Sequence, residues 1–414
     1  MAVPKLRFKE FDGDWDLKNL GDCFSLFSGY AFPSSASVDN GTKWLKIADV
    51  GIQEMTPNNL SFLPNNFTTK FPQFIVSKND YVIALTRPIL NKKLKIAKVG
   101  EFYDGALLNQ RVAKIVSENN NLDFIYSLLQ KSKTVEELEN SIAGTDPPNL
   151  SLNEVKGIVL GIPKVEEQTK IASFLSAVDE KINQLTQKHE LLSQYKQGMM
   201  QKLFSQQIRF KADDGSEFGE WTYCNIGSFL KVKSGLGFKA EEYTTEEEVR
   251  LLQIENVGYG SVKWTHNVKY VPQSYLKLHQ DLVLKEGDLV LALNRPVTNN
   301  KLKIAKLTRL DTPSILYQRV GKLELKHENL DRDFIFQIFQ KEVKSYVLNS
   351  SIGSDQPFIS TTDLYKHYLM LPSKEEQTKI ANFLSAIDQK IEVVAQQIEQ
   401  AKQWKKGLLQ QMFV

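Results

Sequence analysis

The chain has 414 residues, of which 42% are hydrophobic and 10% aromatic, so it is long enough for several packed domains and lacks a disordered composition. Its 52 basic and 49 acidic residues give a net charge of only +3, so any nucleic-acid contact must come from local clusters rather than a global basic field. The N-terminus shows no apolar leader, and no apolar run approaches the roughly 18 residues of a membrane span. We therefore expect a cytoplasmic protein without a membrane partner.

No residue pattern indicates catalysis, a metal site or a bound cofactor. Cys23 and Cys224 are too few and too far apart for a disulfide framework or a zinc knuckle, so both are predicted to be packing residues. The five histidines lack the spacing of metal ligands. The sequence also lacks a glycine-rich strand-to-helix turn and a phosphate loop. We expect no catalytic residue, metal ion or cofactor in this chain.

The first half of the chain is predicted to be a mixed, largely β domain, and its features return in the same order in the second half. Trp15 near the start of the first half matches Trp221 in the second. Apolar runs bounded by turn residues predict strands, and a 3.6-residue period predicts helices. The paired segments are strands at 80–85 and 288–293, lysine-bearing strands at 94–98 and 302–306, and helices around 122–138 and 330–348.

A long helical segment follows each half. Both copies begin with the pattern Pro-x-x-Glu-Glu-Gln-Thr-Lys-Ile-Ala, and Glu375 follows Glu166 at an offset of 209 residues that is kept through the helix. Proline suits the approach to a helix, and an acidic pair suits the positive end of its dipole. Each helix is predicted to span roughly 39 residues, which corresponds to about 58 Å.

Apolar residues recur in these helices at alternating steps of four and three, which is the a/d seam of a coiled coil. Lys196 and Lys405 occupy matching seam positions. The alternative is that each helix packs separately on its own globular half. The seam residues predicted here are Ile171, Leu175, Val178, Ile182 and Leu185 in the first helix and Ile380, Leu384, Ile387, Ile391 and Val394 in the second.

The connectivity favours an antiparallel helix pair. A parallel second helix would require the second half to carry the chain back by about 58 Å, whereas an antiparallel helix returns Val414 to the first half. The predicted fold is therefore α+β: two similar, largely β domains joined by an antiparallel coiled coil, with pseudo-twofold symmetry. The predicted boundaries are 1–163 for the first domain, 164–206 for the central helix, 207–372 for the second domain and 373–414 for the C-terminal helix.

Clusters of basic and amide side chains also recur in both halves. Arginine, lysine, asparagine and glutamine are the residues that contact phosphates and base edges of DNA. The alternative is a solvated surface whose charges only keep the protein soluble. The candidate DNA-binding residues are Arg87, Asn91, Lys92, Lys93, Lys95, Gln110 and Arg111 in the first half, and Arg295, Asn299, Asn300, Lys301, Lys303, Gln318 and Arg319 in the second.

Two polar loops, around Gly144-Thr145 and Gly353-Ser354, add Thr145 and Ser354 to these candidates. The first loop continues into Asp-Pro-Pro, which resembles the Asp-Pro-Pro-aromatic motif of adenine methyltransferases. Its fourth residue, however, is Asn149, and the matching segment in the second half interrupts the proline pair. A methyltransferase site in this chain is therefore disfavoured.

The start of the chain up to Trp15, the Ser-Gly-Tyr-Ala-Phe segment at 28–32, the Gly353-Ser354 loop and the twice-used Glu-Glu-Gln helix together resemble the DNA specificity subunit of type I restriction-modification systems. The resemblance covers essentially the whole chain. It implies two target recognition domains, each reading one half of a split DNA sequence, with the helices acting as a spacer. It also implies two modification (methyltransferase) subunits that bind S-adenosylmethionine, and restriction subunits that use ATP and Mg²⁺ for translocation and cleavage.

The repeat itself leaves open which residues read DNA, because a duplication preserves framework as well as contacts. Leu94, Ile96, Leu302 and Ile304 are predicted to be framework, while the lysines beside them stay open. Specificity is predicted to lie where the halves differ, at 33–42 against 239–248 and at 57–71 against 264–278. A standalone DNA-binding protein and a coiled-coil scaffold without modification partners are the alternative functions.

Overall fold

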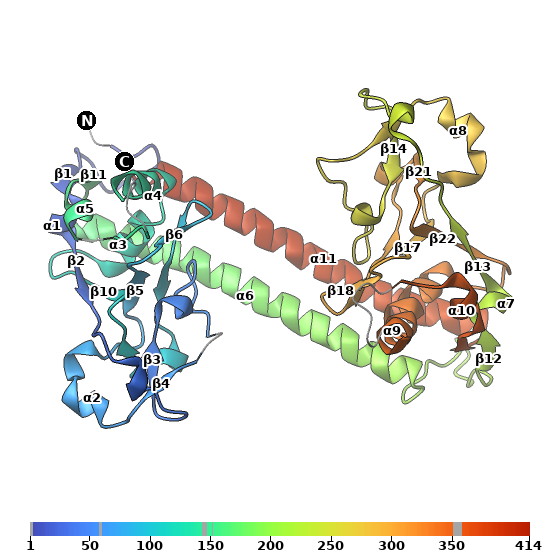
Figure 1. Cartoon of the computed structure of the whole chain (residues 1–414), viewed down its shortest axis with the longest axis horizontal. Helices are drawn as coiled ribbons and strands as arrows, with labels where there is room; N and C mark the ends of the chain where they lie inside the picture. The colour runs from blue at the N-terminus through green and yellow to red at the C-terminus, as the bar shows by residue number, and fades with distance from the viewer. Residues whose placement is uncertain (1–2, 58–59, 143–146, 151, 351–357) are drawn as a thin grey trace. The chain divides into compact units, whose positions relative to one another are not determined.

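A computed structural model describes residues 3–57, 60–142, 147–150, 152–350 and 358–414. The chain forms two compact units: unit 1 consists of Met1–Gln187 and Ala395–Val414, and unit 2 of Lys188–Val394. There are two long helices, α6 (Val165–Phe204) and α11 (Lys374–Gln411) (Figure 1). Each of them is divided between the units, with one stretch in unit 1 and the other in unit 2. Their lengths of 40 and 38 residues agree with the prediction. Among the described residues, none of the helices is both long and apolar enough to cross a membrane.

Unit 1 is built mainly from short strands. An antiparallel sheet has the order β2-β10-β5-β8, and a second sheet has the order β4-β3-β9, in which β3 and β9 are parallel. A ribbon of β1 and β11 and a hairpin of β6 and β7 complete the described strands. The bounds are β1 Asp16–Asn19, β2 Ser25–Ser28, β3 Thr42–Leu45, β4 Phe62–Leu63, β5 Tyr81–Ala84, β6 Ile89–Leu90, β7 Lys93–Leu94, β8 Ile96–Lys98, β9 Leu107–Leu108, β10 Val112–Val116 and β11 Val159–Ile162.

Unit 2 repeats this strand arrangement. Its sheets are β13-β22-β17-β20, β15-β14-β21-β16, the ribbon β12-β23 and the hairpin β18-β19. Strand β16 is the addition, since the described residues of unit 1 form a single bridge, between Ile75 and Leu107, at the corresponding place. The bounds are β12 Thr222–Asn225, β13 Leu230–Ser234, β14 Val249–Leu252, β15 Tyr270–Val271, β16 Val283–Leu284, β17 Leu289–Ala292, β18 Val297–Thr298, β19 Lys301–Leu302, β20 Ile304–Lys306, β21 Ser314–Leu316, β22 Val320–Leu325 and β23 Tyr368–Leu371.

The remaining helices are short, apart from one. The predicted helical stretch of the first half is divided into α3 and α4, whereas that of the second half is the continuous α9. The bounds are α1 Leu20–Cys23, α2 Phe67–Lys70, α3 Leu122–Leu128, α4 Ser132–Ser141, α5 Leu152–Lys156, α7 Ile226–Phe229, α8 Tyr275–Leu278, α9 Arg332–Ser350 and α10 Thr361–Lys366. Single 3₁₀ turns lie at Ser34–Ala36, Ile47–Asp49, Pro72–Phe74, Glu101–Tyr103, Ala240–Glu242, Ile254–Asn256, Gln280–Leu282 and Arg309–Asp311.

The lysine-bearing strands predicted at 94–98 and 302–306 are each interrupted. β7 ends at Leu94 and β8 begins at Ile96, because the chain changes partner at Lys95 from the hairpin to β5. The Lys95 backbone N–H donates to Pro88 O at 2.7 Å. Lys303 makes the same bond to Pro296 O, so the interruption is part of the repeated fold.

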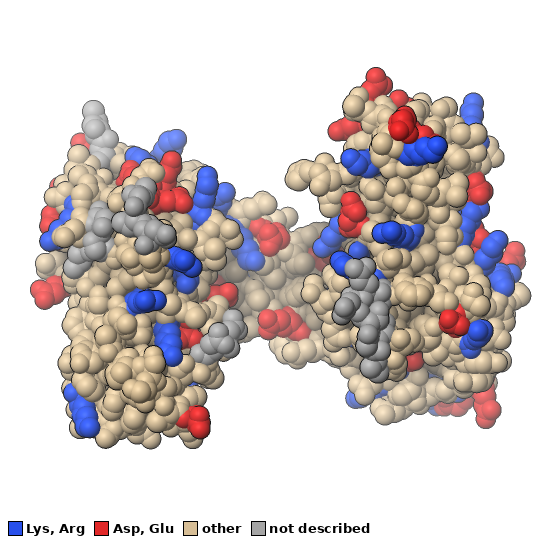
Figure 2. Space-filling view, in the orientation of Figure 1, with Lys and Arg blue, Asp and Glu red and all other residues tan. Residues whose placement is uncertain are grey.

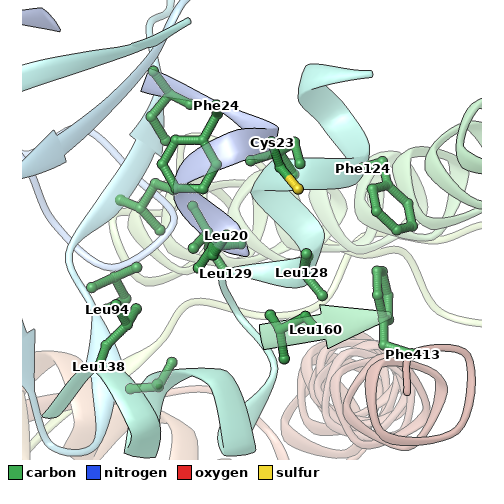
Figure 3. Close-up of a cluster of buried hydrophobic side chains, with 14 of the residues drawn as sticks. Leu20, Cys23, Phe24, Leu94, Phe124, Leu128, Leu129, Leu138, Leu160 and Phe413 are labelled. Carbon is green, nitrogen blue, oxygen red and sulfur yellow. The ribbon is translucent and has the colours of Figure 1, made fainter. Parts of the chain in front are cut away.

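The core of unit 1 includes the end of the chain. In Figure 3, Phe413 lies among side chains from α1, α3 and β11, and its ring centroid is 5.2 Å from that of Phe124. Cys23 belongs to the same cluster and is 2% exposed, as predicted for a packing residue. The return of the last residues to the first half is therefore confirmed within unit 1.

The Glu-Glu-Gln pattern docks each long helix onto its globular half. In unit 1, Arg7 donates from Nε and Nη2 to the Glu167 carboxylate at 2.8 and 2.7 Å, and this hydrogen bonding raises the pKa of the Arg7 guanidinium. Gln168 accepts from the backbone N–H of Asn121, just before α3, and donates to Pro163 O. The second glutamate of the pattern is thus a buried ion-pair partner rather than only a charge at the helix dipole.

Unit 2 repeats the dock. Arg209 donates to the fully buried Glu376 at 3.0 and 2.7 Å, and the Trp221 indole adds a third bond at 3.1 Å. Gln377 accepts from the Asp331 backbone N–H and donates to Pro372 O. These contacts join the pattern to residues far away in sequence. The recurrence of the pattern therefore has a structural cause, since it attaches the helix to the globular half in both units.

Within each unit, the stretches of α6 and α11 are antiparallel. In unit 1, the Leu6 backbone N–H donates to Gln411 O beside the Arg7–Glu167 pair, while Asp179 further along α6 meets Lys405 at 2.6 Å. In unit 2, Lys196 meets Asp388 at 2.7 Å.

The predicted seam residues are all buried or half-buried. Those at the start of each helix also belong to the hydrophobic core of a globular half. At these positions the helix therefore packs both along the seam and on its own half, so the two alternatives both hold there.

Candidate nucleic-acid interface

Backbone hydrogen bonds in unit 1 bring three of the predicted segments together. The segment after β5 lies between the residue before β10 and the stretch 147–150: Leu85 N–H donates to Arg111 O at 2.9 Å, and Leu150 N–H donates to Leu85 O at 2.7 Å. Arg87 N–H donates to Pro148 O at 2.7 Å. The side chains of Arg87 and Arg111 are both exposed. The two arginines are 24 positions apart in sequence, and these backbone hydrogen bonds bring their segments together. We call this hydrogen-bonded set of segments the arginine frame.

Unit 2 builds the same frame. Leu293 N–H donates to Arg319 O at 2.9 Å, and Ile359 N–H donates to Leu293 O at 2.7 Å. Arg295 and Arg319 are exposed, like their counterparts in unit 1. Unit 1 has Asn149 paired with Thr86 at this edge, whereas unit 2 has the exposed Phe358 paired with Asn294. The frame is repeated, and the side chains at its edge differ.

Arg87 and Arg295 adopt an uncommon backbone conformation. Their φ angles are +46° and +45°, in the left-handed region that non-glycine residues rarely occupy. Such conformations concentrate at functional sites, where the surrounding structure enforces them. The same conformation occurs in both halves, so it belongs to the repeated fold.

The Asn and Lys candidates between these arginines lie on a two-residue hairpin turn. Asn91 and Lys92 connect β6 and β7 with φ of +51° and +56°, and Asn299 and Asn300 connect β18 and β19 with φ of +51° and +55°. Two positive φ angles define a type I′ turn, which favours asparagine. The recurrence of asparagine here therefore has a structural cause, while the exposed Lys93 and Lys301 stand at the start of the second strand.

Lys95 and Lys303 make internal contacts. The Lys95 ammonium donates to Ile47 O at 3.1 Å, and the Lys303 ammonium donates to Ile254 O at 2.6 Å. Burial lowers the pKa of both ammonium groups. Each lysine thus fastens a 3₁₀ turn to the strand that follows the hairpin, which is a structural role.

Gln110 and Gln318 are exposed beside the arginines. The Gln110 N–H donates to Tyr30 O at 3.1 Å, and the Gln318 N–H donates to Leu236 O at 2.9 Å. Glutamine and arginine are the residue types that bind adenine and guanine, respectively, in the major groove. Each unit therefore presents this pair on one exposed loop.

Thr145 and Ser354 lie outside the described residues. Of the stretches in which the halves differ, 33–42 contains a 3₁₀ turn, and the described part of 57–71 contains β4 and α2. In unit 2, residues 239–248 contain a 3₁₀ turn, and 264–278 contain β15 and α8. Strands β4 and β15 belong to the same sheets as β3 and β14, and none of these stretches contains a residue of the repeated arginine frame.

Two residues beside the Gln–Arg pairs, Tyr30 and Leu236, are not among the candidates predicted from the sequence. Tyr30 is 42% exposed and Leu236 is 50% exposed. They hold the same place in the repeated Ser-Gly segment but differ from each other. Only the backbone pairing reveals that they adjoin the glutamines. In the sequence, the one indication is that the repeated Ser-Gly segment carries a different residue at this position in each half.

Figure 2 shows basic and acidic side chains interspersed over the visible face of each unit. This mixture agrees with the net charge of +3. The candidate interface consequently depends on local groups rather than on a surface of one sign.

The chain is thus an internally duplicated protein: its two β-rich units repeat one frame of exposed arginine and glutamine, and each unit includes a stretch of both long antiparallel helices. The chain belongs to the family described as "Type I restriction modification DNA specificity domain", whose model matches residues 12–193 and again 219–403.

Similar proteins of this family cover nearly the whole chain. The MjaVIII type I restriction enzyme specificity subunit of Methanocaldococcus jannaschii is 31% identical, over 97% of this chain and 94% of its own length. A type I restriction-modification S subunit from M. genitalium has a similar fold, with a TM-score of 0.63 and 16% identity, over 100% of this chain and 99% of that chain. A chain from a study of complex assembly in a type I R-M system has a TM-score of 0.53 and 17% identity, over 97% and 98%.

Proposed function

We propose that the chain is the DNA-reading subunit of a type I restriction-modification complex, with residues 1–163 and 207–372 each reading one half of a bipartite target. The observation that carries the proposal is the twice-built frame of Arg87 with Arg111 and Arg295 with Arg319. Guanidinium groups bind phosphates or guanine, and the neighbouring glutamines supply amide contacts to adenine. The stretches that differ between the halves support two different half-sites.

Not all predicted contacts contribute equally to this proposal. Lys95 and Lys303 are assigned to holding the fold, since their ammonium groups already donate to backbone carbonyls. Lys92, Lys93 and Lys301 are exposed and suit phosphate contacts, which position a protein without reading sequence. The arginines and glutamines remain as the proposed readers.

The proposed role of the two helices, at 164–206 and 373–414, is to fix the spacing between half-sites and to dock two modification subunits. Methyl transfer would use S-adenosylmethionine bound by those subunits, and translocation and cleavage would use ATP and Mg²⁺ in restriction subunits. The chain itself is proposed to contribute recognition and no catalysis. The proposed location is the cytoplasm, where such a complex meets DNA.

The test is methyl transfer by the complex of this chain with its co-expressed modification subunit. The double variant Arg87→Ala with Arg111→Ala should lose discrimination for one half-site and keep it for the other. Lys133→Ala is the control, because Lys133 is an exposed cation on α4 that pairs only loosely with Glu137 at 3.9 Å. Equal loss in the control and the double variant would contradict the assignment of the frame.

A further inference from the structure

The Ser-Gly segment and the Gln–Arg loop are held together by the same backbone contacts in both units. In unit 1, Tyr30 N–H donates to Leu108 O at 3.0 Å, and the Gln110 N–H donates back to Tyr30 O at 3.1 Å. In unit 2, the bond from Gln318 to Leu236 O repeats the second contact, and Leu236 forms a parallel bridge with Tyr317. The residue after each glycine is thereby fixed next to a proposed reader.

The glycines permit this close approach. A Cβ on Gly29 would lie 2.3 Å from Leu108 O, and a Cβ on Gly235 would lie 2.4 Å from Tyr317 O. No side chain fits at either position without moving backbone. The close contact therefore restricts the glycine, whereas the side chain that follows it is exposed and differs between the two halves.

Tyr30 is also held rigidly. Its ring centroid lies 5.0 Å from those of Phe32 and Phe71 and 5.4 Å from that of Phe74. An exposed ring supported from below by other rings presents apolar surface at little cost in conformational entropy. Such a ring beside a guanidinium and an amide forms a mixed surface of the kind that meets base edges in a groove.

We propose that Tyr30 and Leu236 are specificity-determining residues, each making an apolar contact with a thymine C5-methyl group in one half of the target. The inference rests on the proposed function. It follows from three observations: the shared frame that holds the two residues beside Gln110 and Gln318, their exposure, and their difference in identity. A thymine methyl is the apolar feature of the major groove, and the neighbouring readers address adenine and guanine there.

The experiment deletes the methyl group from the DNA instead of from the protein. Once methylation has identified the two half-sites, each thymine is replaced singly by uracil, and binding is measured with the complex of this chain and its modification subunits. Burial of one methyl group corresponds to about a fourfold change in affinity. We expect one uracil in the first half-site to weaken binding by about this factor for the unmodified chain and to have no effect for Tyr30→Ala.

The second half-site gives the reciprocal result. Leu236→Ala should abolish the uracil effect there and leave the first half-site unchanged. Tyr30→Phe retains the ring and should behave like the unmodified chain, which separates the contact from any effect of Tyr30→Ala on folding. Leu17→Ala and Leu310→Ala are matched controls, because both residues are exposed leucines outside the interface, at 69% and 84%.

The outcomes are distinguishable. An uracil effect that persists in Tyr30→Ala and Leu236→Ala would overturn the inference, as would half-sites in which no thymine responds to uracil; both results leave the proposed function standing. Absence of any sequence preference in the unmodified complex would overturn the proposed function, and the inference with it.

Discussion

The ion pair between Lys196 and Asp388 permits a prediction in which removing either partner destabilises the fold, but by unequal amounts. The Lys196 side chain is 11% exposed and its ammonium lies 2.7 and 2.8 Å from the two carboxylate oxygens, whereas the Asp388 side chain is 38% exposed. Asp388→Ala leaves a nearly buried ammonium unpaired, close enough to Lys301 for repulsion. Leaving a nearly buried ammonium without its partner in this way costs about 3 kcal/mol. For a unit of this size that corresponds to a fall in Tm of roughly 6–12 °C.

Replacing the lysine instead of the aspartate should lower the Tm by less. Lys196→Met leaves a carboxylate that solvent reaches and that still accepts a hydrogen bond from Gln337 Nε2 at 2.7 Å. An ion pair that is more than one-third exposed on one side contributes only about 1 kcal/mol or less. The order of Tm values should therefore be unmodified chain, Lys196→Met, then Asp388→Ala.

The pKa of Lys196 determines whether the stability of Asp388→Ala rises or falls with pH. Burial lowers the pKa of Lys196, and Asp388 opposes this shift. In Asp388→Ala the folded-state pKa falls further below the unfolded value of about 10.4. The unfolded state then binds more protons between the two pKa values, so the stability of this variant rises with pH. Thermal unfolding of the three proteins at pH 7 and pH 9.5 checks this. Equal Tm values for both variants, or a Tm deficit of Asp388→Ala that does not shrink at pH 9.5, would show that Lys196 is not the buried partner of the pair.

Three further substitutions test the remaining contacts. Leu384→Ala removes a fully buried seam residue and should cost about 2–5 kcal/mol in thermal unfolding; an unchanged Tm would mean that the position is not packed as described. Arg209→Met strands the buried Glu376 and should cost about 3–5 kcal/mol, with the loss reduced in the double variant with Glu376→Gln; additive losses would argue against the pair. Arg111→Ala and Arg319→Ala should each relax one half-site by about 1–3 kcal/mol in competition binding, whereas a uniform loss on all sequences would make them phosphate contacts.

The helical part of the fold follows from the sequence because its signal is periodic. A 3.5-residue apolar period kept at one offset in two copies specifies both helices and the seam, and Leu175 and Leu384 are buried as expected. The role of the Glu-Glu-Gln pattern does not follow, since Arg7 meets Glu167 across 160 residues. A contact of that range leaves no local pattern, and only the helix dipole was available to explain the acidic pair.

The candidate site is predictable in composition but not in geometry. Recurrence identifies Arg87 and Arg295, yet recurrence equally marks Asn91 and Asn299, whose cause is a type I′ turn that lacks the usual glycine. Lys95 is likewise predicted as a DNA contact, and nothing in the sequence indicates that its ammonium donates to a backbone carbonyl 48 residues away. Duplication alone does not separate residues that hold a frame from residues that use it.

Methylation profiling tests whether this chain gives a complex its DNA specificity. The comparison is between DNA from cells that express the chain together with its modification partner and DNA from cells that express the partner alone. We expect a new bipartite methylated motif with fixed spacing that appears only when the chain is present. No new motif from a soluble complex of the two proteins would contradict it.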